Sequence, residues 1–364
     1  NLTKKQIRSL AREAAEANRS QVSFVNAMGN AGPGIDASWE VAKKAVMTTA
    51  EAMLAAGAAV TAIGVASVGV GKEFESAMSS WAATADATQE DYEKARAAAM
   101  EMGRSTSKTA TESAQALEYM ALAGWNVEAS IAGLPGVLRL SEATGLDLAR
   151  TSDLVTDSMS ALGVEIGGLA SYLDVAAKAN NQSNQTAEEL MEAYLGVGGT
   201  MKNLNIPIQE SATALGVLAN RGIKGSEAGN ALNAVMINLT SGTGQAGKMM
   251  GKLGISAFDS EGKFIGLYET LHEVDTALAG LNEEERNAAL AAIGGKQHVD
   301  ALNDLLSGLN ITVADGVTEW EKLEKELYDA GGALEQMAAT KLDNLAGDMD
   351  ILQSALQDSG IRIY

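Results

Sequence analysis

Neighbouring carboxylates are the first residues in this sequence that could do chemistry. Glu188, Glu189 and Glu192 stand within one short stretch, where two acids could serve a hydrolase as general acid and base. Thr186 precedes Glu189 by three residues, which is the spacing of a capping box at a helix start. Acids in a first turn also stabilise a helix through its dipole. The pattern therefore predicts the start of a helix, and we expect no catalytic residues.

The sequence contains few residues that could bind a metal ion or act as a nucleophile. The chain has no cysteine, which excludes disulfides, thiolate metal sites and cysteine nucleophiles. Of its two histidines, His298 has Asp300 nearby and His272 lies between Glu269 and Glu273. Neither has a second imidazole in range. Without paired histidines or a serine elbow, we expect surface or interface histidines, no metal site and no enzyme.

Two glycine motifs suggest phosphate binding, but their context argues against it. Gly242, Gly244 and Gly247 spell GxGxxG after ALNAVMINL, which has helical periodicity, whereas a dinucleotide site needs a buried strand there. VGVGK ends at Lys72, and Glu73 follows where a phosphate loop needs a hydroxyl. We interpret the first motif as a flexible loop and expect no cofactor.

One stretch has β character. ISAFDSEGKFI, residues 255–265, predicts two short strands around a turn at 259–262. A calcium loop would need a longer acidic series with glycine at its sixth position. Asp259 and Glu261 are therefore interpreted as turn residues.

The charge of the chain argues against nucleic acid as a ligand. The 47 acidic residues outnumber the 27 basic ones, which gives a formal net charge of −20. Such a surface repels phosphate, so we expect no direct nucleic-acid binding.

Helices must carry these residues. Aromatic residues make up 4% of the chain, and most of the 38 glycines punctuate apolar periods, which favours close packing of helices through small side chains. Apolar residues recur at helical spacing over most of the chain. We predict an all-α fold of helical hairpin units, long helices and coiled-coil segments, with one short β-hairpin near 255–265.

The clearest element is a helical hairpin within 111–161. Gly124 is expected to end its first helix in the left-handed conformation, and Trp125 provides a large apolar plug. Asn126 can then cap the second helix. Pro135 removes a backbone donor from that second helix and should kink it.

Two other passages echo this hairpin. Aligning Gly124 with Gly222 needs no gap and matches several alanine and leucine positions, whereas aligning Gly124 with Gly163 gives a weaker match. We interpret the three as related helix-turn-helix units. They make up a predicted core of repeated helical hairpins over 109–310.

Two helical regions are predicted before this core. Residues 1–30 form an N-terminal amphipathic helix, and 36–108 a long helix that contains an apolar segment at 52–71. The segment could cross a hydrocarbon layer, but its glycines and alanines contribute little apolar area. It is a helix in the core of an oligomer, a segment that inserts conditionally into a membrane, or a constitutive membrane anchor. The residues proposed for insertion are Met53, Leu54, Val60, Ile63, Val65 and Val68.

Residues 316–364 are predicted to form a C-terminal helix with coiled-coil periodicity. Apolar residues alternate spacings of three and four, with one slip, which is typical of a coiled-coil seam with a stutter. Self-association along this seam and packing back onto the hairpins both remain open. The seam residues are Leu323, Leu327, Leu334, Leu342, Leu345, Met349, Leu352 and Leu356.

Several ordered blocks of the chain resemble phage tail tape measure proteins. They are ALEYMALAGWNVEASIAGLPGVLRLSEATGLDLARTSDLVTDSMSALG, LANRGIKGSEAGNALNAVMINL, LGISAFDSEGKF and TKLDNLAGDMDILQSALQDSGI, within a similarity that runs from about Phe74 to Gly360. The resemblance implies a structural tail protein that sets tail length. It also implies that the protein fills the lumen of the tail tube as a rod and leaves ahead of the DNA during genome ejection.

The resemblance also implies partners and locations. The chain is expected to form a homo-oligomer, taken as a trimer, inside the tail tube protein and in contact with baseplate or tail-tip hub proteins. Apolar helices awaiting cover suggest a tail assembly chaperone. The expected locations are the virion tail, the host cytoplasm during assembly, and the host envelope during delivery, with possible membrane contact. A membrane-active delivery or pore role for 52–71 and a cell-wall hydrolase are the alternatives.

Overall fold

The computed structural model describes residues 60–313 and 316–363, and in these ranges the regular elements are helices. The predicted all-α fold is confirmed. In place of the short β-hairpin there is one antiparallel bridge between Phe258 and Phe264. Between them the Asp259 carboxylate accepts hydrogen bonds from the amides of Glu261 and Lys263, so the turn forms without flanking strands.

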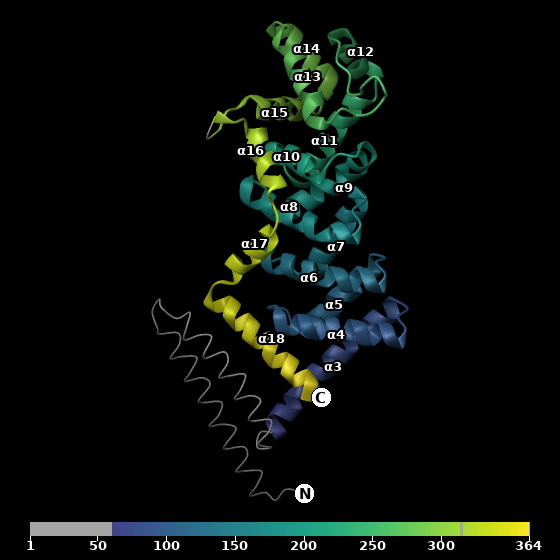
Figure 1. The fold of residues 1–364 in the computed structure, drawn as a ribbon, viewed down its shortest axis with the longest axis vertical. Coiled ribbons are helices and arrows are strands. Elements are labelled where there is room, and N and C mark those ends of the chain that lie inside the picture. The colour runs from purple at the N-terminus through teal and green to yellow at the C-terminus, as the bar shows by residue number, and fades with distance from the viewer. Residues whose placement is uncertain (1–59, 314–315, 364) are drawn as a thin grey trace, which may run out of the picture.

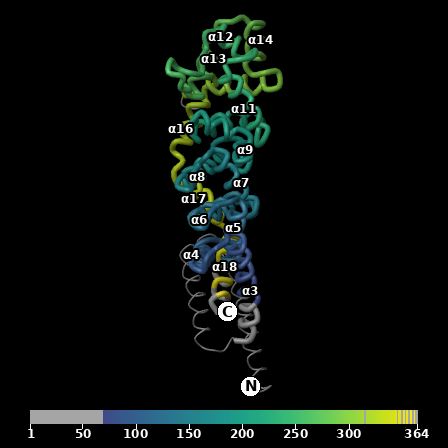
Figure 2. The backbone as a smooth tube through the Cα atoms, turned by 90° about the vertical axis from the view of Figure 1, so that its right-hand side faces the viewer, coloured from purple at the N-terminus to yellow at the C-terminus, as the bar shows by residue number. Residues whose placement is uncertain are grey.

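Seven of the described helices stack in two neighbouring columns (Figure 1). Each helix packs on the next member of its own column, and helices of one column also contact helices of the other, which produces an elongated body that is also narrow from the side (Figure 2). Column A consists of α5 (Ala110–Leu122), α7 (Leu148–Leu162), α9 (Ala187–Leu204) and α11 (Gly225–Thr240). Column B consists of α6 (Val127–Thr144), α8 (Leu169–Gln182), which the short 3-10 helix η1 (Ile166–Gly168) precedes, and α10 (Ile208–Asn220).

One turn geometry leads from column A to column B three times. At Gly124, Gly163 and Asn205 the backbone is left-handed, with φ of 87°, 69° and 53°. The following residue is apolar and donates its amide to a carbonyl in the last turn of the preceding helix, which closes a Schellman motif. These apolar residues are Trp125, Val164 and Ile206. Local sequence therefore dictates each of these hairpins.

Gly222 makes the same turn in the opposite direction. Its φ is 94°, and the Ile223 amide donates to the carbonyl of Leu218 at 3.1 Å. This turn connects α10 of column B to α11 of column A. The sequence echo between Gly124 and Gly222 is therefore a repeat of local turn geometry and not of position in the stack.

Close backbone approach holds column A together. A Cβ built on Gly198 of α9 would lie 2.8 Å from the Cβ of Ala161 in α7, and one built on Gly229 of α11 would overlap the carbonyl of Ala193 in α9. The three helices run parallel, because the first turns of each helix lie beside the first turns of the next one in the column. Small residues at these crossings let helix backbones touch, as the composition predicts.

The helices before the stack correct one prediction. The long helix expected over 36–108 is, in its described part, two helices, α3 (Val60–Thr84) and α4 (Gln89–Ser105), which both pack on α5. Asp86 adopts a φ of 48°, and Thr88 forms a capping box with Asp91, so a new helix starts. Polar capping therefore overrides the apolar periodicity that continues across this point.

The apolar segment 52–71 is only partly described. Residues 1–30, Met53 and Leu54 lie outside the described ranges, and in α3 the side chains are described only from Gly69 onward. Across residues 60–313 and 316–363, every helix is too short or too polar to span a bilayer. Insertion through Val60, Ile63, Val65 and Val68 therefore stays a prediction.

Four shorter helices close the far end of the stack. In Figure 1 they lie at the end opposite α3, and α15 turns the chain back toward α10. The GxGxxG glycines form the loop before the first of these helices and its first turn. The helices are α12 (Gly244–Leu253), α13 (Leu267–Ala279), α14 (Glu283–Gly294) and α15 (Val299–Asn310).

The last segment, residues 316–363, runs back along column B and is here called the strap. The single coiled-coil helix predicted for it is wrong, since the strap consists of α16 (Glu319–Tyr328), α17 (Ala333–Leu342) and α18 (Leu345–Ile363). Gly332 at φ 79° begins α17, and a tight turn after Leu342 begins α18. The strap ends beside α3, at the opposite end of the stack from α12–α14 (Figure 1).

The seam residues of the strap face the protein's own helices where they are described. Leu323, Leu327 and Leu334 are buried, and Leu342 is half-buried. The side chains of Leu345, Met349, Leu352 and Leu356 lie outside the described set. In its first half, therefore, the strap packs back onto the hairpins, which was the second of the two sequence interpretations.

Candidate functional site at the C-terminal strap

The first strap helix is anchored by apolar burial. Trp320, Leu323 and Leu327 lie on one face of α16 and are at most 4% exposed. They pack on α8, α10 and α15, and the Trp320 ring lies 5.9 Å from the ring of Tyr268. Thr318 and Glu321 form a capping box that starts this helix. An indole buried to this extent makes α16 the firmest part of the strap.

Arg221 fixes the start of α16 on the stack. It follows α10, donates to Glu319 at 2.8 Å and lies 3.8 Å from Asp304 of α15. The neighbouring Asn220 amide donates to the other oxygen of Glu319 at 2.7 Å. Because Arg221 and Glu319 are largely buried, this pair is less screened by solvent than a surface ion pair.

Two side chains of α8 hold the joint between α16 and α17. Lys178 pairs with Glu326 at 2.7 Å. One turn earlier, the Asp174 carboxylate accepts hydrogen bonds from the amides of Gly332 and Leu334 at 2.9 and 3.0 Å. Gly332 has no side chain with which to cap α17, so an acid from a distant helix satisfies the amides and interacts favourably with the helix dipole.

Arg139 of α6 ties α17 into a wider network. Its guanidinium contacts Glu142 at 2.8 Å and Glu335 of α17 at 3.1 Å. Glu142 is buried and also accepts hydrogen bonds from the amide and hydroxyl of Ser107. The strap, α6 and the loop before α5 are thereby linked through one buried carboxylate.

The last strap helix is tied by polar groups at the end of α4. The buried Ser354 hydroxyl lies 2.6 Å from the carbonyl of Gly103 and 2.8 Å from that of Lys108. Gly103 lies in the last turn of α4, where the helix itself provides no donor, and Lys108 follows the helix. Asp358 is 4% exposed and lies 3.8 Å from Arg104. This end of the strap therefore depends on buried polar contacts.

Several carboxylates lie close together where α16 meets the stack. Glu210 of α10 accepts a hydrogen bond from the amide of Tyr268 at 2.8 Å, and Glu269 and Glu324 lie near it. Burial raises the pKa of both Glu210 and Glu324, and the neighbouring carboxylates raise them further. Ionisation of this group therefore opposes the docking of α16.

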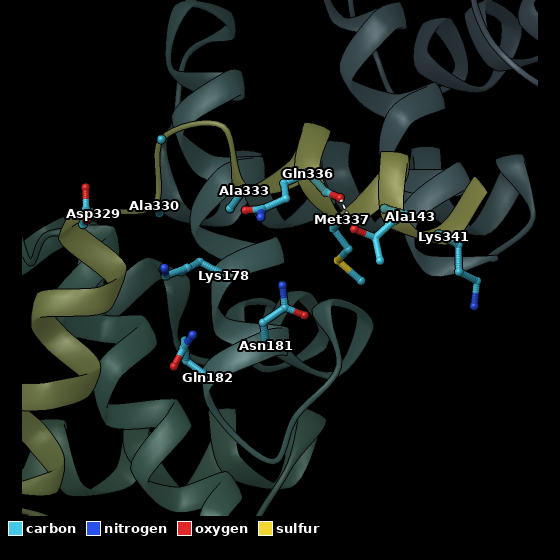
Figure 3. A pocket seen from close by; sticks show the side chains of 12 residues that line it. Ala143, Lys178, Asn181, Gln182, Asp329, Ala330, Ala333, Gln336, Met337 and Lys341 are labelled. Atoms are coloured by element: carbon cyan, nitrogen blue, oxygen red, sulfur yellow. Dashed lines mark hydrogen bonds between the residues drawn. The ribbon is translucent and has the colours of Figure 1, made fainter. Parts of the chain in front are cut away.

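An open notch of about 650 Å³ lies beside the joint between α16 and α17. Lys178, Asn181 and Gln182 of α8 line one side, and Gln336 and Lys341 of α17 the other (Figure 3). The lining mixes carboxamides with two ammonium groups, and one of these is already paired with Glu326. The notch, whose lining also includes the carboxylate of Asp329, separates parts of the strap from α8.

The acids and histidines singled out in the sequence do not gather into a site. Glu188 and Glu192 accept from Arg150 of α7 and so tie two layers of column A. Glu189 completes the capping box with Thr186. His272 stacks on Tyr268, with ring centroids 6.0 Å apart. Across residues 60–313 and 316–363, no three ligating side chains are placed to hold a metal ion.

The turn residues singled out in the sequence lie at the hairpins. Asn126 accepts from the amide of Ala129 as the cap of α6. The Trp125 ring covers Gly133, where any larger residue would collide with it. Pro135 lies on the exposed side of α6, which continues through it.

Sequence reasoning missed the groups that hold the strap, namely Asp174, Arg139 and Ser354. Each of them bonds to a residue far away in the chain. Asp174 and Lys178 stand four residues apart, a spacing typical of a pair within one helix, yet each of them contacts a distant residue of the strap. Short-range spacing carries no information about such partners.

The region that contains both columns matches a known protein family. The family described as phage-related minor tail proteins matches residues 96–295, which is more than half of the chain. This chain belongs to that family. In this minor tail protein, the matched region begins within α4 and ends just after α14, so it contains both columns. The strap lies outside the matched region.

Two curated relatives extend the likeness. The minor tail protein is 33% identical over 296 residues to the tape measure protein of Pneumococcus phage Dp-1, in a match that covers 81% of this chain and 25% of that protein. It is 25% identical over 311 residues to the probable tape measure protein of Escherichia phage P2, covering 84% of this chain and 37% of that protein. No solved structure matches it. The chain thus spans a quarter to little more than a third of these relatives.

Proposed function

We propose that this chain is part of a tape measure protein, which sets the length of a phage tail. The observation that carries the proposal is the similarity to two proteins named as tape measure proteins over more than four-fifths of the chain. The sequence blocks that resemble this family lie in both columns, at the end of α12 and just after it, and in the strap, so the likeness is not confined to one short motif.

The architecture suits a protein whose length matters. In the columns, successive hairpins add layers along one axis, so the reach of the body increases with the number of units (Figure 1). Helices packed in this way lie roughly 10 Å apart. A part built by repetition can change in length without changing its fold.

The surroundings of the chain follow from this proposal. A homo-oligomer in the lumen of the tail tube would contact the tube protein along its side and the tail-tip hub at its end. Its net charge of −20 would keep it from adhering to DNA that must later pass through the same tube. A chaperone would cover its apolar faces during assembly, and the protein would leave ahead of the genome. We propose a structural role without catalysis.

In-frame deletion of residues 146–182 in the phage gene tests the proposal. This removes α7 and α8 and joins Gly145 to the loop that caps α9, so the order of columns is preserved. If the region acts as an extended helix, the tail should shorten by about 55 Å at 1.5 Å per residue. If it acts as a folded stack, the tail should shorten by only about 10 Å, the spacing of packed helices.

Tail length is measured on intact virions by electron microscopy. A second variant that duplicates residues 146–182 should lengthen the tail by the corresponding amount, and it distinguishes a ruler from a mere assembly defect. The matched control is Gly199→Ala, at a helical position with nothing within 4 Å of the added methyl group. Assembled tails of unchanged length in both the deletion and the duplication would reject the ruler role.

A further inference from the structure

We propose that the strap is a latch, which opens before the columns do and in the order α18, α17, α16. The role of this latch rests on the proposed function, because opening the strap first would let the folded body lengthen from one end. The opening itself is a property of the fold and can be tested on the isolated chain. Three observations support it.

The first observation is where the two ends of the described chain meet. The strap carries the chain back past column B, so α18 packs on α3 and α4 (Figures 1 and 2). The start of α3 and the end of α18, which bound the described part of the chain, therefore lie at the same end of the body. Tension applied through both ends acts first on the contact between α18 and α3, and only afterwards on the stack.

The second observation is a gradient of contacts along the strap. The start of the strap has Trp320, Leu323 and Leu327 buried against three helices. Towards its end, the buried side chains that the structure describes are the polar Ser354 and Asp358 and one apolar residue, Ile361. Polar groups that leave the protein interior regain hydrogen bonds from water, whereas exposing the large apolar surface of the buried α16 side chains is unfavourable. The end of the strap should therefore detach at a lower cost than its beginning.

The third observation is the presence of two joints. Gly331 and Gly332 separate α16 from α17, and a tight turn at Asp343 and Asn344 separates α17 from α18. Each joint allows one helix to leave while the next stays docked. Asp174 and Arg139 fasten α17 between the two joints, so they act as the middle catch of the latch.

The columns lack such a sequence of joints and catches. Their helices meet backbone to backbone at Gly198 and Gly229, and column A is closed by Schellman turns with local hydrogen bonds. Separating one layer would expose apolar surface on both of its neighbours. The columns should therefore stay folded when the strap has opened.

Single-molecule stretching of the full chain tests the latch. Since the chain has no cysteine, Gly69→Cys provides a unique exposed attachment point on α3, with a terminal tag as the second. The expected record has an early, low-force event that lengthens the chain by at most about 170 Å, the extended length of the strap at 3.3–3.6 Å per residue. Longer events at higher force should follow as the columns open. One event that releases the whole chain together would overturn the proposal.

Two controls assign the early event to the strap. Attachment at Gly69→Cys and Ile311→Cys leaves the strap outside the stretched path, since Ile311 is exposed and precedes α16, and the early event should then disappear. The double substitution of Asp174→Asn and Arg139→Gln should lower the force of the early event. Lys248→Gln on the exposed face of α12 is the matched control and should leave that force unchanged.

Hydrogen exchange on the unmodified chain tests the order of opening. Amides of 345–363 should exchange first, followed by 333–342 and then 319–328, with those of α9 and α11 last. Equal protection of α18 and α9 would contradict a latch, even if tail length changes as the ruler role requires. The latch and the ruler can therefore fail independently of each other.

Discussion

The columns and the strap are built from similar helices but held by different kinds of contact. In the columns, each turn is closed by hydrogen bonds between residues close in sequence, as at Gly124 and Gly222. The strap is held on the stack by hydrogen bonds between residues about a hundred or more positions apart in the chain. The side chains of Asp174, Arg221 and Ser354 make these bonds. The comparison shows that a stack of hairpins can fold on local rules, while the element that closes it depends on the stack being present.

The two regions also differ in how much change in packing their helix contacts tolerate. Column A brings backbones into contact at glycines, so its geometry has little room for change. The strap lies on side chains and ion pairs, which can rearrange or separate. The family match covers the columns and omits the strap, in agreement with this division. Four substitutions test the contrast, from the largest expected effect to the smallest.

Trp320→Ala should have the largest effect. Removing a fully buried indole costs about 3–5 kcal/mol, and here the loss falls on the anchor of the strap. Hydrogen exchange should speed up throughout 319–363, while α9 and α11 keep their protection. Tyr328→Ala on the same helix is the control, because that side chain is 57% exposed and its removal should change little. Equal loss of protection in columns and strap would break the proposed division.

Gly229→Ala should destabilise the columns instead. The added methyl group would overlap the carbonyl of Ala193, and such overpacking costs about 1–3 kcal/mol after the usual gain in helix propensity. Gly199→Ala is the matched control in column A, where nothing lies within 4 Å and stability should rise by about 1 kcal/mol. Urea unfolding of both variants measures the difference, and a stabilised Gly229→Ala variant would contradict the close approach.

Asp174→Ala should weaken the strap by about 1 kcal/mol, the usual cost of losing a helix cap. The amides of Gly332 and Leu334 lose their acceptor, so exchange should increase in α17 and barely change in α16. Asp153→Ala, on the exposed side of α7, removes the same charge without removing a cap. If both variants behave alike, Asp174 acts only through charge.

Glu324→Gln should produce the smallest effect, and one of opposite sign. Burial raises the pKa of Glu324, with Glu210, Glu269 and Glu321 as further causes. A carboxyl group whose pKa is raised in the folded state stabilises it at low pH, and that contribution is lost as pH rises through the raised pKa. At pH 7 the substitution should therefore add stability, by at most about 0.5 kcal/mol because the group is partly solvated.

The pH dependence of unfolding distinguishes this effect from a general one. Between about pH 4 and 7, Glu324→Gln should flatten the decline in stability with rising pH. Glu321→Gln on the same helix is the opposite case, since hydrogen bonds from Thr318 lower the pKa of Glu321. Its stabilising contribution is present above the ordinary pKa and is lost as pH falls. Parallel pH profiles for the two variants would contradict the assigned environments.

Local chemistry in the sequence was enough to determine the helices and their turns. Thr186 and Asn282 with their acids three residues later predict helix starts that the structure contains. Gly124 and Gly222 predict left-handed ends because few other residues adopt a positive φ without strain. The break between α3 and α4 at Asp86 is also encoded by nearby residues, since Thr88 forms the capping box that starts α4. The apolar periodicity that continues across this point concealed that signal.

The tertiary structure alone decided where the last segment lies and what it holds. Leu323, Leu327 and Leu334 show the same periodicity whether they face another copy or the protein's own helices, so the pattern could not choose between a coiled coil and a strap. The choice depends on Trp320, Glu326 and Glu335 meeting partners in α13, α8 and α6. Helix periodicity specifies which face is apolar, whereas the identity of the surface that covers it is set only by the packed chain.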